Sequence, residues 1–246
     1  MSTSPEAVYV LVHGSWHGGW CWQKLVPFLR QEHVTVYTPT LTGLGERRHL
    51  VTPTTGLHVH IEDIVNLLEF EDIHDAILVG HSYGGMILTG VAEQSDRVAK
   101  LVYFDAIVPD NGQSIFDLID GTEEAFRQNA DAQGLVPSWP PEDFGVTNPE
   151  DIAWMKPRLT PMPLLTHAEK VHAPTMRARQ LSRSFIHCTQ FGLGGFARKI
   201  EREGGTVFTL DSGHDAMIIK PRELAEILLA AAGAQRSPAA ASPGSG

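Results

Sequence analysis

The chain has 246 residues, of which 42% are hydrophobic and 20% charged, and this composition suits a single soluble domain with a sizeable core. Its formal charge of -10, with no stripe of basic residues, excludes an electrostatic attraction to nucleic acid or to an anionic membrane surface. Two cysteines without a CxxC pair and no apolar run of membrane-spanning length argue against a zinc site and a membrane helix.

Strand-like and helix-like segments alternate along most of the chain. Short β-branched runs predict strands, apolar residues at helical spacing predict helices, and Pro221 suits the first turn of a last helix. Repeated strand–helix units predict an α/β fold, with a mostly parallel twisted sheet covered by helices on both faces. In chain order the predicted elements are strand 7–12, helix 22–31, strand 34–37, helix 61–68, strand 76–79, helix 86–93, and strands 98–104, 184–187 and 206–210.

One stretch interrupts this alternation. Residues 109–181 are rich in proline, contain Trp139 and Trp154, and lie between two predicted strands. The stretch is too long for an ordinary connection, so we predict an inserted cap or lid. The core then consists of residues 1–108 and 182–235, and residues 236–246 form a disordered tail.

The segment Gly80-His81-Ser82-Tyr83-Gly84-Gly85 fits the pattern G-x-S-x-G between a predicted strand and a predicted helix. In that context the serine occupies a sharp, strained turn that exposes its hydroxyl above the sheet. Glycines two residues to either side avoid collisions with the neighbouring strand and helix. The pattern predicts that Ser82 is a nucleophile; the alternative is a glycine-rich turn without chemistry.

The segment 13–20, His-Gly-Ser-Trp-His-Gly-Gly-Trp, follows the first predicted strand. An oxyanion hole needs two backbone N–H groups that face the reacting carbonyl. We expect one from Tyr83, the residue after the nucleophile, and the other from Ser15. The alternative is a tight strand-to-helix turn that binds nothing.

His214 lies in Asp211-Ser212-Gly213-His214-Asp215, just after the last predicted strand and before the last helix. A histidine there can reach Ser82 from the carboxyl edge of the sheet, and imidazole is a suitable general base because its pKa lies near neutrality. His81 is adjacent to the nucleophile and points to another side, so it is not the base.

The segments HGSWHGGWCW (13–22), GHSYGGM (80–86) and SGHDAMIIKP (212–221) resemble the α/β-hydrolase superfamily, and more narrowly the small esterases similar to plant methylesterases and hydroxynitrile lyases. The resemblance implies a triad acid after the strand that follows the cap, but residues 185–192 contain no carboxylate. Some members of the superfamily take the acid from the strand after the nucleophile helix, which here ends at Asp105. We therefore expect Asp105 to be the acid. The alternatives are Asp211, a Ser–His dyad, and a purely structural Asp105.

Two positions help to distinguish ester hydrolysis from hydroxynitrile cleavage, which are the two reactions that this resemblance allows. The lyases carry threonine where this chain has Gly14, and lysine where it has Asp215, so the resemblance implies a hydrolase. A hydroxynitrile lyase and a non-catalytic small-molecule receptor on the same fold are the alternatives.

The predicted substrate is a small aromatic or apolar ester, such as a methyl ester, with a carbamate or activated amide left open. We expect no metal, no cofactor, no nucleic-acid or membrane partner and a cytoplasmic location, while a homodimer stays open. The tryptophans have a second interpretation, in which they only hold the cap onto the core. The predicted substrate-binding residues are Trp16, His81, Trp139, Trp154, Met155, Met162, Leu165 and His167.

Overall fold

The structure is a computed structural model that describes residues 7–233, so the predicted disordered tail 236–246 lies outside the described residues. A six-stranded parallel sheet forms its centre, with the strand order β2-β1-β3-β4-β7-β8. Short β-branched and aliphatic runs, such as the fully buried Ala-Ile-Leu-Val of β3, form these strands. The strands are β1 (Val8–Val12), β2 (Thr35–Tyr37), β3 (Ala76–His81), β4 (Val98–Phe104), β7 (Ser182–Cys188) and β8 (Thr206–Leu210).

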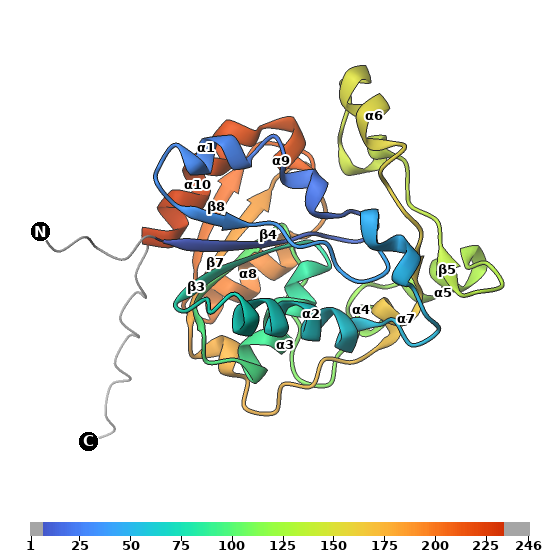
Figure 1. The fold of residues 1–246 in the computed structure, drawn as a ribbon, viewed down its shortest axis with the longest axis horizontal. Helices are drawn as coiled ribbons and strands as arrows, with labels where there is room; N and C mark the ends of the chain where they lie inside the picture. Colours follow the sequence, from blue (N-terminus) through green and yellow to red (C-terminus); the bar gives the residue numbers. More distant parts are fainter. Residues whose placement is uncertain (1–6, 234–246) are drawn as a thin grey trace, which may run out of the picture.

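Helices cover both faces of the sheet, which confirms the predicted fold class. Helices α1 and α10 pack together on one face, and α2 and α3 pack together on the other (Figure 1). The apolar residues Ile61, Ile64 and Leu68 point inward from α2 because they repeat at helical spacing. The core helices are η1 (Gly19–Trp22), α1 (Val26–Arg30), η2 (Gly45–Leu50), α2 (Leu57–Phe70), α3 (Gly84–Gln94), α8 (Gly194–Arg202), α9 (Ala216–Ile219) and α10 (Pro221–Gly233).

The prediction of one helix over residues 22–31 is wrong. The structure has a 3-10 helix that ends at Trp22 and a separate short helix α1 that begins at Val26. Pro27 lies in the first turn of α1, where its missing N–H costs nothing, but its ring would clash with the carbonyl of an earlier turn. The proline therefore starts a new helix.

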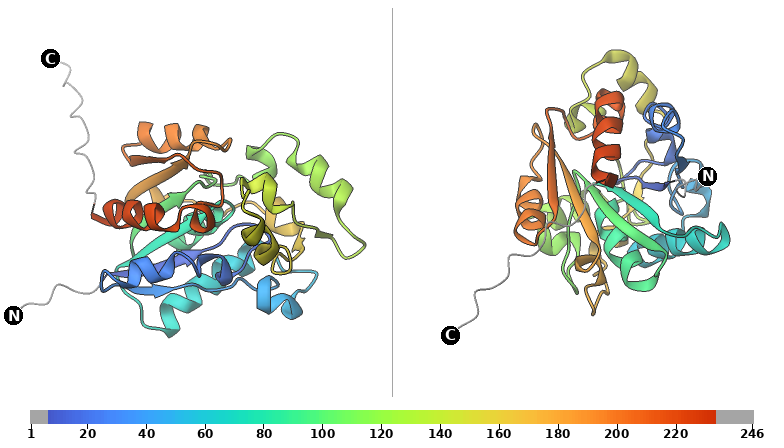
Figure 2. Two further views of the ribbon diagram at one scale, coloured as in Figure 1. Left: turned by 90° about the horizontal axis from the view of Figure 1, so that it is seen from above. Right: turned by 90° about the vertical axis from the view of Figure 1, so that its left-hand side faces the viewer.

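The chain leaves the sheet after β4 and returns at β7, and most of the residues between form small elements beyond the carboxyl ends of the strands (Figures 1 and 2). The last of these elements, η4, packs against α3 and the beginning of β7. We refer to residues 109–181 as the cap. Among the helices of residues 7–233, none has the length and apolar character needed to cross a bilayer. The elements of the cap are α4 (Ile115–Leu118), α5 (Thr122–Asn129), β5 (Leu135–Val136), η3 (Pro141–Phe144), α6 (Pro149–Met155), β6 (Met162–Pro163), α7 (Leu165–Ala168) and η4 (Arg177–Arg179).

The register of the central strands determines which loops meet. Val12 of β1 pairs with Gly80 of β3, and His81 of β3 pairs with Phe104 of β4. Because the strands are parallel, their carboxyl ends lie at the same edge of the sheet. The segments that follow β1, β3 and β4 therefore lie side by side, and they contain Ser15, Ser82 and Asp105.

Candidate active site

Ser82 occupies the sharp turn between β3 and α3, and its φ of 54° lies in the left-handed region that few residues other than glycine adopt. The neighbouring glycines allow this turn. A Cβ on Gly80 would lie 2.8 Å from the carbonyl carbon of Gly84, and a Cβ on Gly84 would lie 2.9 Å from the carbonyl oxygen of Val12. The local sequence therefore presents the serine side chain at the edge of the sheet.

Asp105 and His214 are in direct contact, although they lie 109 positions apart in the sequence. Nδ1 of His214 lies 2.6 Å from Oδ2 of Asp105, and Oδ1 of Asp105 accepts the backbone N–H of Cys188 at 3.2 Å. Asp105 is completely buried and His214 is 3% exposed. Because the carboxylate accepts, Nδ1 of His214 carries the proton. Its Nε2 bonds to no residue between 7 and 233.

Asp211, the rival acid, lies away from this contact. Its carboxylate accepts hydrogen bonds from the Thr189 hydroxyl at 3.2 Å and from the Gln190 amide at 2.9 Å on the exposed side of the loop. These bonds lower the pKa of Asp211. The structure therefore brings Asp105, and not Asp211, to His214.

Aromatic rings hold the imidazole of His214 in place. Phe191 stacks on it with ring centroids 4.0 Å apart, and His81 lies on another side at 4.4 Å. Nε2 of His81 donates a hydrogen bond to the carbonyl of His214 at 3.2 Å. Burial, and the nearby His214 and His17, keep the pKa of His81 well below its ordinary value. His81 is thus a neutral support for the loop that carries His214.

The backbone amides of Ser15 and Tyr83 are free to serve a ligand. Neither donates a hydrogen bond to another residue within 7–233. A Cβ on Gly14 would lie 2.9 Å from Cβ of Ser82, so only glycine there lets the backbone of this loop come so close to the serine. Both amides are therefore available as hydrogen-bond donors near the predicted nucleophile, as an oxyanion hole would require.

A second histidine–aspartate pair lies next to the first. Nε2 of His17 lies 3.0 Å from Oδ2 of Asp215, and Nδ1 of His17 donates to the carbonyl of Ser15 at 2.7 Å. Burial by itself lowers the pKa of His17, but the charge and hydrogen bond of Asp215 outweigh it, so the pKa is raised. The pair links the Ser15 loop to the residue that follows His214. Sequence reasoning missed this link, although both residues stand in the motifs.

A pocket opens above Ser82 and His214, and it encloses about 630 Å³, its open mouth included. Its walls are mostly apolar and aromatic, and four of the predicted substrate-binding residues contribute to them. The lining residues are Ser15, Trp16, His17, His81, Ser82, Ile107, Ile115, Ile119, Thr122, Phe126, Trp139, Phe144, His167, Phe191, Leu193 and His214.

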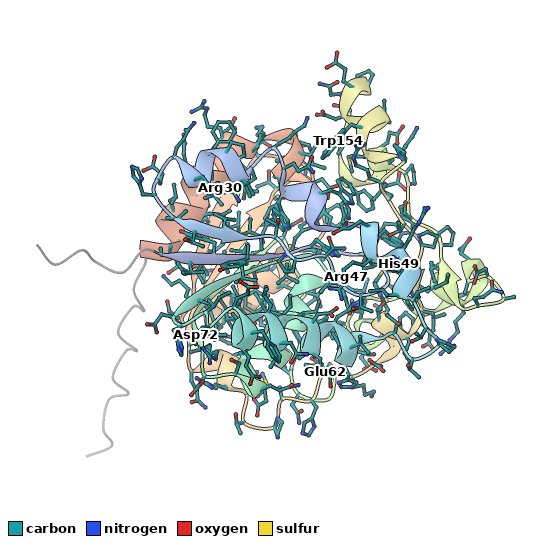
Figure 3. The ribbon with its side chains drawn as sticks, viewed as in Figure 1. Arg30, Arg47, His49, Glu62, Asp72 and Trp154 are labelled. Atoms are coloured by element: carbon teal, nitrogen blue, oxygen red, sulfur yellow. The ribbon has the colours of Figure 1, made fainter. Side chains whose placement is uncertain are left out.

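The other four predicted substrate-binding residues do not line this pocket. Trp154 lies on α6 (Figure 3), where it packs edge-on against Trp20 of η1 with ring centroids 5.2 Å apart. Met155 and Met162 are fully buried away from the pocket, and Leu165 lines a separate cleft. For Trp154 the structure thus agrees with the second interpretation, in which the tryptophan holds the cap onto the core.

Sequence reasoning also missed lining residues. Phe126 of α5, Phe144 of η3 and Phe191 after β7 line the pocket, and each sits in a segment without a recognisable motif. Only the way the cap folds over the sheet brings them together. Among residues 7–233, no group of three or more His, Cys, Asp or Glu side chains is arranged to hold a metal ion.

Comparisons with known proteins show similarity along nearly the whole chain. Residues 9–227 match the model of the alpha/beta hydrolase family. A carbendazim hydrolyzing esterase from Nocardioides sp. (strain SG-4G) is 35% identical, over 91% of this chain and 99% of that protein. An extracellular alpha/beta-hydrolase from a Paenibacillus species has a similar structure, with a TM-score of 0.82 and 25% identity over 92% of this chain and 98% of that one.

A methylesterase from Arabidopsis shares the fold, with a TM-score of 0.75 and 23% identity over 92% of this chain and 99% of that one. The family match covers most of the chain, and the Nocardioides relative aligns over nearly its full length. The chain therefore belongs to the alpha/beta hydrolase family and is a hydrolase related to the methylesterases.

Proposed function

We propose that the chain hydrolyses small aromatic or apolar carboxylic esters through an acyl-enzyme on Ser82. The observation that carries this proposal is the 2.6 Å contact between Nδ1 of His214 and Asp105, at the edge of a pocket that Ser82 also lines. A buried carboxylate that orients a histidine beside an elbow serine is the arrangement that acyl transfer requires.

In the proposed mechanism, Oγ of Ser82 attacks the ester carbonyl carbon while Nε2 of His214 takes its proton. The backbone amides of Ser15 and Tyr83 hold the oxyanion, and each such donor contributes about 3–4 kcal/mol to transition-state stabilisation. His214 then protonates the departing alcohol. A water molecule, activated by the same nitrogen, attacks the acyl group and regenerates Ser82. Asp105 accepts the Nδ1–H of His214 and so holds the tautomer of that ring.

The substrate class follows from the walls of the pocket. Trp16, Trp139, Phe126 and Phe144 surround the space above Ser82, and such walls favour a flat apolar or aromatic group. A carbamate belongs to the proposed range, because the Nocardioides relative is named for hydrolysing carbendazim, which is a carbamate. The same two-step chemistry applies to a methyl ester and to a carbamate.

Turnover of p-nitrophenyl acetate tests the nucleophile. We expect the purified protein to release p-nitrophenol and the Ser82→Ala variant to lose this activity, with its circular dichroism spectrum unchanged. Ser182→Ala, at the start of β7 and far from the pocket, is the matched control. An acyl mass on the peptide that contains Ser82 identifies the intermediate. Full turnover by Ser82→Ala would contradict the proposal.

The alternatives have distinct signatures. A lyase releases benzaldehyde from mandelonitrile, whereas the proposed esterase does not. A receptor binds a small molecule without turning over any ester. Gly14 and Asp215 stand where the lyases carry threonine and lysine, which favours the esterase.

A further inference from the structure

A chain of hydrogen bonds connects the pocket to the interior of the cap. Oγ of Ser15 lies 3.2 Å from Nε2 of His167, and Nδ1 of His167 lies 2.9 Å from Oγ1 of Thr166. The Thr166 hydroxyl donates to the carbonyl of Pro163 at 2.6 Å. All three side chains are at least nine-tenths buried, and Ser15 and His167 line the pocket.

The carbonyl at the end of the chain determines the direction of every bond, because a carbonyl can only accept. The single proton of Thr166 points to Pro163, so Thr166 must accept from Nδ1–H of His167. Burial lowers the pKa of His167 to about 3, which leaves the ring neutral near pH 7. Its Nε2 is then an acceptor, and the Ser15 hydroxyl donates its only proton to it.

Ser15 therefore presents lone pairs, and no proton, to the pocket. We propose that Oγ of Ser15 is a hydrogen-bond acceptor for the substrate, so that the enzyme prefers acyl groups that carry an N–H or O–H donor on the atom next to the reacting carbonyl. The proposal rests on the proposed function, because it places that carbonyl at Ser82. Carbamates with an N–H and 2-hydroxy esters are the two sources of such a donor.

This role differs from that of an oxyanion donor. The backbone N–H of Ser15 serves the carbonyl oxygen of every substrate, whereas the side chain can serve only substrates that bring a proton. Loss of the side chain should therefore change the ratio between substrates, and loss of an oxyanion donor should slow all of them equally.

Three methyl esters of similar length separate these outcomes: methyl phenylacetate without a donor, methyl mandelate with an O–H, and methyl N-phenylcarbamate with an N–H. The measurement is kcat/KM for each, expressed relative to methyl phenylacetate. In Ser15→Ala we expect this relative value to fall about three- to tenfold for the donor that the site accepts, as expected for one neutral hydrogen bond. The substrate whose relative kcat/KM falls shows whether the site accepts an O–H or an N–H donor.

Thr166→Val tests the direction of the bonds without changing an atom of the pocket wall. Valine cannot accept from Nδ1–H of His167, so the imidazole is free to take the other tautomer and to donate to Ser15. We expect the relative value to fall in this variant as well. Thr55→Val replaces another buried threonine away from the pocket, and it should leave the relative kcat/KM unchanged.

The experiments distinguish a failure of the Ser15 acceptor role from a failure of the proposed esterase function. If methyl phenylacetate is hydrolysed in a Ser82-dependent manner, but Ser15→Ala leaves both relative values as in the wild type, the acceptor role is wrong and the esterase proposal stands. An equal loss for all three substrates also overturns the acceptor role. If Ser82→Ala hydrolyses the three esters as well as the wild type, the proposed function itself fails.

Discussion

Two buried histidine–aspartate pairs lie at the same edge of the sheet, and they differ in what the second ring nitrogen of the histidine contacts. In the His214–Asp105 pair, Nδ1 faces the carboxylate at 2.6 Å, and Nε2 bonds to no residue between 7 and 233. In the His17–Asp215 pair, one nitrogen faces the carboxylate at 3.0 Å and the other donates to the carbonyl of Ser15 at 2.7 Å.

The comparison separates the pair that we propose to be catalytic from one that is suited to a structural role. Both imidazoles are buried and within hydrogen-bond distance of a carboxylate, so neither burial nor the carboxylate contact distinguishes them. A general base needs a nitrogen that can exchange a proton with the substrate. His17 has both nitrogens occupied by acceptors within the protein, and it is suited to holding two loops together.

The largest expected effect comes from Asp105→Asn. An asparagine can donate to Nδ1 of His214 and so stabilise the tautomer whose Nε2 carries a proton and cannot act as a base. We expect kcat for p-nitrophenyl acetate to fall by about 10³–10⁴-fold, as in other triads that lose the carboxylate. Asp211→Asn, on the exposed side of the neighbouring loop, should retain normal turnover. A loss of less than about threefold in Asp105→Asn would place the acid elsewhere.

The second pair should act mainly on stability. His17→Leu leaves the carboxylate of Asp215 buried and without its partner, which costs about 3–5 kcal/mol in the free energy of unfolding. Urea denaturation measures this loss, and His17→Leu combined with Asp215→Leu should recover much of it. His74→Leu, which breaks an exposed pair with Asp72, is the control and should leave the urea midpoint unchanged. Equal stability of His17→Leu and wild type would refute the structural role.

A third buried histidine, His167, should make the stability of the protein depend on pH. Burial lowers the pKa of His167 to about 3, whereas the unfolded chain titrates near 6.5. Below pH 6.5 the unfolded state binds a proton that the folded state does not, so stability falls as the pH falls toward 3. Between pH 7 and pH 5, wild type should lose about 2 kcal/mol more than His167→Phe.

Urea denaturation of both proteins at the two pH values measures this difference. His58→Phe replaces an exposed histidine and serves as the control, with the same pH response as wild type. An unchanged pH response in His167→Phe would show that this ring is not held neutral in the folded protein.

The smallest expected effect concerns two tryptophans of the cap. Trp139 lines the pocket and packs against Trp16 with ring centroids 5.0 Å apart, whereas Trp154 packs on Trp20 outside it. Trp139→Ala should raise KM for an aromatic ester about two- to fivefold with little change in kcat. Trp154→Ala should leave both constants unchanged. A raised KM in Trp154→Ala, with no change in Trp139→Ala, would indicate that the substrate binds on the α6 side of the cap.

Features that depend on neighbours in the chain could be predicted from the sequence. The turn at Ser82 needs a strand, two glycines and a helix, and all of them stand within a few residues. Pro27 was a similar local signal, because a proline favours the first turn of a helix. The prediction of a single helix over residues 22–31 did not take it into account. The pocket walls had no comparable signal, because Phe126 and Phe191 reach the site only through the path of the cap and of the loop after β7.

The sequence by itself determined the alternation of strands and helices, the elbow serine and the loop that carries His214, because periodicity and turn chemistry act over a few residues. Only the tertiary structure decided that Asp105 meets His214, that His17 meets Asp215 and that His167 meets Ser15. Those contacts join residues 109, 198 and 152 positions apart. The parallel register of the sheet and the packing of the cap create these contacts. Neither can be predicted from the local sequence around only one of the two residues in contact.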